Sequence, residues 1–437
     1  MTGMLRRDFL TRAGSTAAAV ALARGAAAAA ADERVVVAVI GTGGMGSGHV
    51  RELARRDDVE LAAVCDVDRD RLAAAVRLVT EAGKPAPQAV GDLRHVLDDR
   101  RIDAVWIATP DHWHAPAAIL ALDAGKHVYV EKPCCHTIRE GRLLAAAVAR
   151  SGRHLQVGTQ SRSSATVRAG IGRILDGEIG DVLVSKAWNS QRRGSIGRSE
   201  PSTPPAQLDF EGWLGPAPPT DYRSNLLPGV WRWWYDFGCG DMGNDGVHDI
   251  DVALWGLGVT EDPTLASCFG RKLFFDDDQQ FPDTQYAVFE FPGAGPGGQA
   301  KQMIFEQRIW SPYVQEGYEN GAAFYGTEGM LVMGHSVGWK LYGPRNKLLA
   351  EETGGAGIQA HHDDFLGCIR GDLDRPSADV RAGVQAATLV HLANISARVG
   401  RTLAFDREAG RILDDPEADA LVTRRYRDGH WAVPREG

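Results

Sequence analysis

Short apolar runs alternate with amphipathic stretches over the first third of the chain. The run from Val35 to Ile40 is followed by a glycine-rich turn and a helix-like stretch to about Arg56. Five further elements follow, namely a strand over Glu60–Cys65, a helix over Asp68–Ala82, a strand over Ala104–Thr109, a helix over Ala115–Ala124 and a strand over His127–Val130. Strands that alternate with helices predict a parallel sheet with right-handed crossovers, over residues 33–152.

The pattern changes beyond residue 152. Strand-like stretches lie among long loops at Val182–Trp188, Thr284–Phe291 and Gln302–Ile309, which is typical of a mostly antiparallel sheet. Helical spacing over Val384–Val399 ends at Gly400, which suits a C-terminal cap. We therefore expect an α/β fold in which a second, α+β domain with a mostly antiparallel open sheet covers residues 153–437.

The turn after the first predicted strand is rich in glycine and reads Gly41-Thr42-Gly43-Gly44-Met45-Gly46. In a strand–turn–helix context, Gly41 permits the tight turn, Gly43 lets the backbone approach a pyrophosphate, and Gly46 lets the helix pack closely on the strand. The N–H groups at the helix start, around Gly44 and Met45, then face the phosphates. The sequence thus predicts a Rossmann dinucleotide-binding domain.

Asp66 ends the second predicted strand, twenty residues after Gly46. A carboxylate at this place accepts hydrogen bonds from ribose hydroxyls and repels a 2′-phosphate. NAD is therefore the expected cofactor, while Arg69 and Arg71 nearby leave NADP open.

The first 31 residues differ from all later ones. Arg6 and Arg7 precede Phe9, and an Ala-rich stretch without acids follows. This pattern predicts a twin-arginine signal read by the machinery that exports folded proteins, and hence a periplasmic or secreted protein. An Ala-rich tail without a fold is the competing interpretation. Elsewhere the chain has no apolar stretch of the ~20 residues that a membrane span requires.

The charge and composition of the chain limit the classes of ligand that we expect it to bind. The formal net charge of −9 gives no electrostatic reason to expect nucleic acid, and a neutral, hydroxyl-rich ligand suits it better. The cysteines lack the paired spacing of a zinc site and are expected in the core. The pairs His112–His114 and His361–His362 could suggest a metal, but the first pair lies in a cofactor motif and the second opens a helix-like stretch, so no metal is predicted.

Three motifs in order, Ala108–Pro116, Gly125–Pro133 and Gly240–Asp251, resemble the Gfo/Idh/MocA oxidoreductases, which include glucose-fructose oxidoreductase and inositol dehydrogenase. The resemblance implies a homo-oligomer paired through the open sheet. It also implies that the nicotinamide half of the cofactor pocket is lined by Thr109, Pro110, His114, Glu131 and Lys132.

Lys132 and His248 are the expected catalytic residues. An ammonium at Lys132 can polarise a substrate hydroxyl, and a neutral imidazole at His248, near a helix start capped by Asn244 or Asp245, can accept its proton. A solvated lysine and a structural histidine are the competing interpretations. Family dehydrogenases carry Asp where this chain has Asn244, so the proton relay is expected to differ.

The predicted substrate residues come from several segments. Trp231, Trp233, Trp234 and Tyr235, close before Asp236, form either a sugar platform or part of the core. Gln160 and Arg162 resemble residues near the family's substrate, and Asn244, Asp245 and His248 are expected beside it.

The expected function is oxidation of a sugar or polyol hydroxyl by a tightly held NAD(P). An exported enzyme has no supply of soluble dinucleotide, so its cofactor must be reoxidised in place. Transient oxidation that permits glycoside cleavage, elimination or epimerisation is one alternative. A non-catalytic exported sugar-binding protein is the other.

Overall fold

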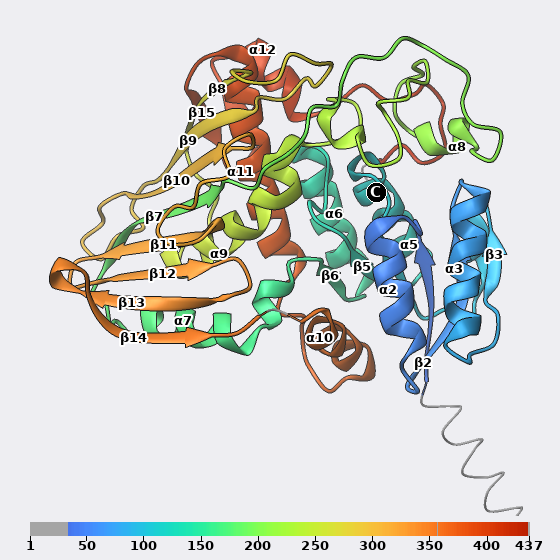
Figure 1. Cartoon of the computed structure of the whole chain (residues 1–437), viewed down its shortest axis with the longest axis horizontal. Coiled ribbons are helices and arrows are strands. Elements are labelled where there is room, and N and C mark those ends of the chain that lie inside the picture. The colour runs from blue at the N-terminus through green and yellow to red at the C-terminus, as the bar shows by residue number, and fades with distance from the viewer. Residues whose placement is uncertain (1–33, 356, 436–437) are drawn as a thin grey trace, which may run out of the picture.

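Two β-sheets organise the computed structural model, which describes residues 34–355 and 357–435 (Figure 1). The predicted export signal lies outside the described residues. The first sheet has the strand order β3-β2-β1-β4-β5-β6 and is parallel throughout. Its strands are β1 Val35–Ile40, β2 Val59–Cys65, β3 Gln88–Val90, β4 Ala104–Ile107, β5 His127–Val130 and β6 Leu155–Val157. This is the strand order of dinucleotide-binding Rossmann domains, as predicted.

Helices connect these strands: α2 Gly44–Ala54, α3 Arg69–Glu81, α4 Leu93–Asp98, α5 Asp111–Asp123 and α6 Ile138–Ser151. Helix α5 begins at Asp111, four residues before the predicted start at Ala115, because Pro110 is extended and the chain turns helical directly after it. Strand β6 lies beyond residue 152, where the sequence predicts the domain to end, because three residues are too few to form a recognisable pattern.

The second sheet has ten strands in the order β14-β13-β12-β11-β7-β10-β9-β8-β15-β16. Only β7 and β10 pair in parallel, so the mostly antiparallel sheet is confirmed. The strands are β7 Val182–Asn189, β8 Leu265–Arg271, β9 Thr284–Phe291, β10 Lys301–Arg308, β11 Asn320–Gly326, β12 Met330–Gly334, β13 Gly338–Gly343, β14 Lys347–Thr353, β15 Leu403–Asp406 and β16 Arg411–Leu413.

One face of this sheet is covered by helices. Their bounds, with those of the remaining helices, are α7 Ala165–Leu175, α8 Phe210–Leu214, α9 Val247–Leu257, α10 Ile358–Arg370, α11 Val380–Val399 and α12 Pro416–Asp419. Helix α11 packs on β8 and β9, α9 packs on β7 and β11, and α7 packs on β12 and β13. The alternation of exposed and buried residues along β8 shows that the opposite face is open.

Two helices of the second half tie the domains together. Helix α10 buries Phe365 and Leu366 against Val37 and Trp106 of the parallel sheet. Helix α11 contacts α6 and β6 as well as the second sheet, and ends at Gly400 in the left-handed conformation, as predicted. The two sheets therefore flank a shared interface, which holds the site described below.

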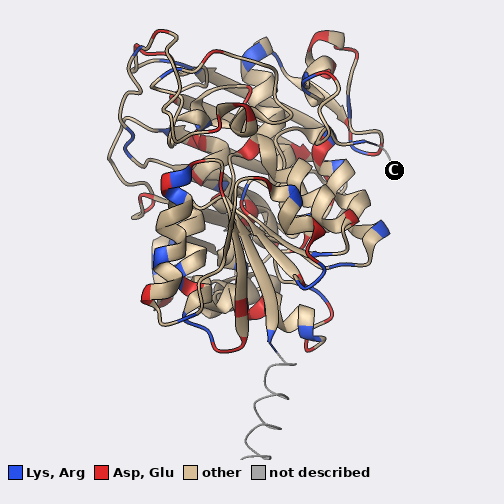
Figure 2. Ribbon diagram, turned by 90° about the vertical axis from the view of Figure 1, so that its right-hand side faces the viewer, with Lys and Arg blue, Asp and Glu red and all other residues tan. Residues whose placement is uncertain are grey.

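Surface charge is mixed. On the side of the molecule shown in Figure 2, lysine and arginine are interspersed with aspartate and glutamate over both domains. Among the described residues, no helix combines the length and apolar character needed to cross a membrane.

Candidate active site

The glycine turn between β1 and α2 is closely packed. Gly41 has a positive φ of 85°, and a Cβ there would lie 2.6 Å from the carbonyl oxygen of Ala108. A Cβ at Gly46 would overlap the carbonyl oxygen of Gly41. A Cβ at Gly43 would lie 2.5 Å from Nη1 of Arg71. Side chains at Gly41 and Gly46 would therefore displace the backbone from the position in which it can approach a phosphate, whereas one at Gly43 would displace the flexible guanidinium of Arg71.

Gly46→Ala should destabilise the protein and weaken dinucleotide binding. The added methyl group forces the turn away from α2, a strain of roughly 1–3 kcal/mol. Gly48→Ala is the matched control on the same helix, because no atom of the described residues lies within 4 Å of its added Cβ. Thermal unfolding and NADH titration of both variants test this, and equal behaviour of the two would contradict it.

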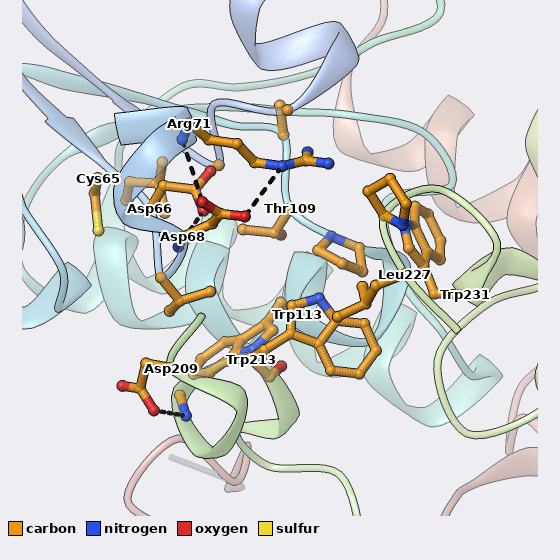
Figure 3. A pocket seen from close by; sticks show the side chains of 18 of the residues that line it. Cys65, Asp66, Asp68, Arg71, Thr109, Trp113, Asp209, Trp213, Leu227 and Trp231 are labelled. Atoms are coloured by element: carbon orange, nitrogen blue, oxygen red, sulfur yellow. Dashed lines mark hydrogen bonds and ion pairs between the residues drawn. The ribbon is translucent and has the colours of Figure 1, made fainter. Parts of the chain in front are cut away.

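Asp66 follows directly after β2 and is held rigidly. Its Oδ2 accepts hydrogen bonds from the backbone N–H of Thr42 at 2.7 Å and from Oγ1 of Thr42 at 3.0 Å, and its Oδ1 accepts one from the backbone N–H of Asp68 at 2.9 Å. The guanidinium of Arg69 turns away and donates to the carbonyl of Ala206. Arg71 stays beside Asp68 (Figure 3).

A cleft of about 910 Å³ runs from this carboxylate to the second domain. Its volume lies in the range of ligand sites. Thr109, Pro110, His114, Glu131 and Lys132 all line it, together with the glycine turn. Oγ1 of Thr109 is buried and, within the described chain, has no hydrogen-bond partner. The glycine turn, the carboxylate of Asp66 and this free hydroxyl fit a dinucleotide.

Glu131 is 5% exposed and anchored from α2. Its Oε1 lies 3.0 Å from Nε2 of His49, and Nδ1 of His49 lies 2.9 Å from Nε2 of His362. Burial acts to raise the pKa of Glu131, but the hydrogen bond to His49 and the charge of Lys132 outweigh it and lower the pKa. The carboxylate therefore stays ionised beside Lys132.

Lys132 joins the two domains at the cleft. Its Nζ donates a hydrogen bond to the backbone carbonyl of Asn244 at 2.8 Å, and both residues line the cleft. An ammonium has three N–H donors, so two remain for other partners.

His248 lies one helical turn beyond Asn244, on α9, and is 6% exposed. Its Nδ1 is buried without a hydrogen-bond partner among the described residues. Burial, with the nearby charges of Lys132, His335 and His361, lowers its pKa well below the ordinary value. The imidazole is therefore neutral. His248 itself is not among the residues that line the cleft, but its ring lies close enough to Lys132 for the charge of Lys132 to act on it.

The predicted helix cap before His248 is wrong. A π-helix over Met242–Gly246 runs directly into α9, so the chain is already helical at the predicted cap. Nδ2 of Asn244 donates to Asp241 at 3.1 Å, and Asp245 pairs with Arg193.

Comparison with known proteins identifies the family. Residues 35–159 match the Gfo/Idh/MocA family part described as "Oxidoreductase family, NAD-binding Rossmann fold", and residues 181–284 and 356–433 match its "C-terminal alpha/beta domain". The chain belongs to the Gfo/Idh/MocA family. Its parallel-sheet domain is therefore an NAD-binding Rossmann domain.

Curated relatives match over shorter stretches. A "Glycosyl hydrolase family 109 protein" of Stenotrophomonas maltophilia is 42% identical over 137 residues, which is 30% of each chain. A protein of the same name from Saccharopolyspora erythraea is 35% identical over 156 residues, or 35% of this chain and 34% of the relative. The match thus spans about a third of the length of these relatives.

Solved structures share the fold across both domains. The WlbA dehydrogenase from Bordetella pertussis, solved with NADH and UDP-GlcNAcA, superposes with a TM-score of 0.63 at 20% identity, covering 85% of this chain and 99% of that one. The aldose-aldose oxidoreductase from Caulobacter crescentus, complexed with glycerol, superposes with a TM-score of 0.63 at 18% identity. The superposition covers 85% of this chain and 100% of that one.

Not every predicted substrate residue of this Gfo/Idh/MocA protein reaches the cleft. Trp231 lines it, but Trp233 is 5% exposed within the protein interior and Asp236 is exposed outside it. Arg162 is held by Asp251, which accepts from its Nε at 2.8 Å, and it does not line the cleft. The remaining predicted substrate residues outside the cleft lining are Gln160, Trp234, Tyr235, Asp245 and His248.

Several aromatic residues that the sequence did not single out line the cleft instead, namely Trp113, Trp213, Tyr222 and Trp431. Trp113 lies inside a recognised motif, but a lone tryptophan gives no sign of the surface it will face. Trp213 comes from the five-residue helix α8 and Trp431 from a turn, and neither is long enough to show a periodic pattern.

Proposed function

We propose that the protein oxidises a hydroxyl of a sugar or polyol with a tightly held NAD, NADP being the less favoured cofactor because of Asp66. One observation carries the proposal: at the cleft, Lys132 bridges the dinucleotide-binding domain and the π-helix that runs directly into α9, which bears His248. A bound nicotinamide supplies the hydride acceptor. The protein supplies the groups that bind the substrate and move its proton.

Lys132 and His248 divide this work. The two N–H bonds of Lys132 that Asn244 leaves free orient the substrate hydroxyl and stabilise negative charge on its oxygen. The lowered pKa of His248 keeps its ring neutral, and the ring accepts the proton of a substrate hydroxyl that reaches past Lys132 to it. Asp245 is paired with Arg193 and Asn244 has no acidic group, so neither replaces His248 as the base.

A sugar suits the cleft wall near Lys132. Trp231 offers a flat apolar face for sugar C–H groups, and the Asn244 side chain offers polar atoms for hydroxyls. The fold relatives solved with UDP-GlcNAcA or named aldose-aldose oxidoreductase support this substrate class.

A second function, cleavage of a glycoside through transient oxidation, is favoured by the relatives named glycosyl hydrolase family 109 proteins. Oxidising a ring hydroxyl to a ketone acidifies the neighbouring C–H. Loss of that proton permits departure of the glycosidic oxygen as the alcohol, water then adds to the unsaturated ketone, and return of hydride to the ketone completes hydrolysis without net oxidation.

The test starts from the purified protein with its dinucleotide identified by mass spectrometry. Sugars, polyols and aryl glycosides are then screened for reduced-nicotinamide absorbance and for release of the aglycone. Net reduction with free sugars supports the dehydrogenase, and aglycone release without net reduction supports the glycosidase. A dinucleotide-loaded protein that binds sugars yet gives neither signal would be the non-catalytic binding protein and would refute both.

We also propose that residues 1–31 direct export through the twin-arginine pathway to the periplasm or beyond. The Arg6-Arg7 pair before an Ala-rich stretch supports it. Replacing both arginines by lysine should keep the protein, with its cofactor, in the cytoplasm, as cell fractionation would reveal. Unchanged export of that variant would argue against the pathway.

We propose that the protein forms a homo-oligomer whose subunits contact one another through the open face of the second sheet. Exposed apolar side chains gather there on β8, β9 and β16: Leu265, Phe269, Tyr286, Val288 and Leu413. Apolar patches of this kind mark protein–protein contacts. Light scattering of Phe269→Glu against the wild type tests the pairing, which the buried charge should disrupt.

A further inference from the structure

Two segments outside the parallel-sheet domain line the cleft on the side across from the glycine turn. The first is residues 205–213 and the second is residues 427–431; together they are called the clasp. Figure 3 shows Asp209 and Trp213 of the first segment across the cleft from Asp66 and Arg71. We propose that the clasp retains a bound dinucleotide through repeated turnovers and prevents its exchange with solution. The inference rests on the proposed function only for the identity of the ligand.

The first segment is fixed to the loop that follows β2. The backbone N–H of Arg69 donates to the carbonyl of Gln207 at 3.1 Å, and the backbone N–H of Asp209 donates to the carbonyl of Val67 at 2.9 Å. These bonds lie within three residues of Asp66, which lines the cleft and is the residue expected to bind the adenosine ribose of a dinucleotide. The segment therefore lies beside the adenosine half of the cleft.

The far end of the first segment is fixed to α5. The carbonyl oxygen of Trp213 accepts a hydrogen bond from Nε1 of Trp113 at 3.0 Å and lies 3.0 Å from Nε2 of His112. Trp213 also stacks on Phe210, with ring centroids 5.7 Å apart. Hydrogen bonds at both ends thus hold the segment against the Rossmann domain.

The second segment secures the first. Arg427 forms an ion pair with Glu211 of the first segment, and its backbone N–H donates to the carbonyl of Pro216 at 2.9 Å. Beyond it, the ring of Trp431 lies under the guanidinium of Arg94, 4.7 Å from Cζ to the ring centroid. Figure 1 shows α8 and the red C-terminal segment together above α3 and α5. The Arg427–Glu211 pair is the latch of the clasp.

Release of the adenosine half requires this arrangement to part. The first segment is held both by the loop after β2 and by Arg427 of the second segment, so moving it away from the cleft breaks bonds to both. Such a movement is slow compared with exchange from an open groove. Retention would suit the export proposed above, because soluble dinucleotide is not supplied there, but the contacts of the clasp do not depend on export.

The experiment measures NADH dissociation directly and needs no substrate. Protein loaded with NADH is mixed with excess NAD⁺, and the decay of NADH fluorescence gives the dissociation rate constant. The test variant is Glu211→Ala with Arg427→Ala. The control is Arg173→Ala with Glu178→Ala, which removes an ion pair of 2.8 Å whose partners are 38% and 41% exposed, outside the clasp.

The latch variant should release NADH ~5-fold faster than the wild type, the effect of one partly exposed ion pair, while the control matches the wild type. The wild type should keep its dinucleotide through gel filtration. Equal release from the latch variant and wild type, or loss of NADH from the wild type during gel filtration, overturns the clasp but leaves the proposed oxidation intact. Absence of any NADH binding overturns both.

Discussion

Lys132→Met is expected to lower turnover by ~10²- to 10³-fold, the loss typical of removing one donor that stabilises a developing oxyanion. Methionine keeps an unbranched side chain, shorter by one atom, but has no N–H group for the substrate oxygen. NADH should still bind, because the glycine turn and Asp66 hold the dinucleotide at the other end of the cleft. Steady-state kinetics with the substrate found in the screen, beside an NADH titration, measures both.

Lys301→Met is the matched control. Its Nζ donates to the carbonyl of Leu257 at 2.7 Å, so it too binds a backbone carbonyl at one end of α9, but it lies outside the cleft. Both variants lose one ammonium–carbonyl bond, and only Lys132→Met should lose turnover. Equal activity of the two variants would show that Lys132 serves only to join the domains.

The Rossmann domain could be predicted closely because its signals are local. Strands β1 and β5 are continuous apolar runs bounded by polar residues or glycine, and they form at the predicted positions. The turn at Gly41 and Gly46 likewise depends on contacts within one strand–turn–helix unit and its neighbouring strand. Short elements such as β6 were missed, since three residues carry no periodicity.

Substrate residues were harder to predict, because their surroundings depend on partners far away in sequence. Arg162 has the charge of a substrate ligand, yet Asp251, 89 positions later, holds its guanidinium. Asp245 is likewise held by Arg193. Trp231 and Trp233 are two residues apart in the same 3₁₀ turn, but only Trp231 lines the cleft. Which side chain faces the ligand is decided by tertiary packing.

The two histidines that hold Glu131 in place, His49 and His362, also could not be paired from the sequence. His49 and His362 are 313 positions apart, and their hydrogen bond exists only because α10 returns to the parallel sheet after the second domain. His362 drew attention in the sequence as a metal candidate, whereas the structure places it behind Glu131. The sequence shows that an imidazole stands at position 362, but it does not show that His49 is the partner of this imidazole in the fold.

His248→Asn is expected to lower turnover by ~10²- to 10⁴-fold, the usual contribution of a general base. Asparagine fills much of the same volume and cannot take up a proton. His335→Asn is the companion variant: the His335 ring packs at 80° to that of His248, 5.2 Å between centroids, but its Nδ1 is held by Asp249. It should keep most of the activity, and a similar loss in both variants would indicate a structural role for the pair.

The pH dependence of the wild type gives a second, independent check on His248. A base works only when deprotonated, so turnover falls as the pH drops through its pKa. Burial, followed by the charge of Lys132, holds the pKa of His248 well below the ordinary value of 6.5. Turnover should therefore show no acid limb centred near ~6.5, where an ordinary imidazole titrates. A limb at that position that disappears in His248→Asn would mean that His248 is solvated during turnover, contrary to the buried, neutral base proposed here.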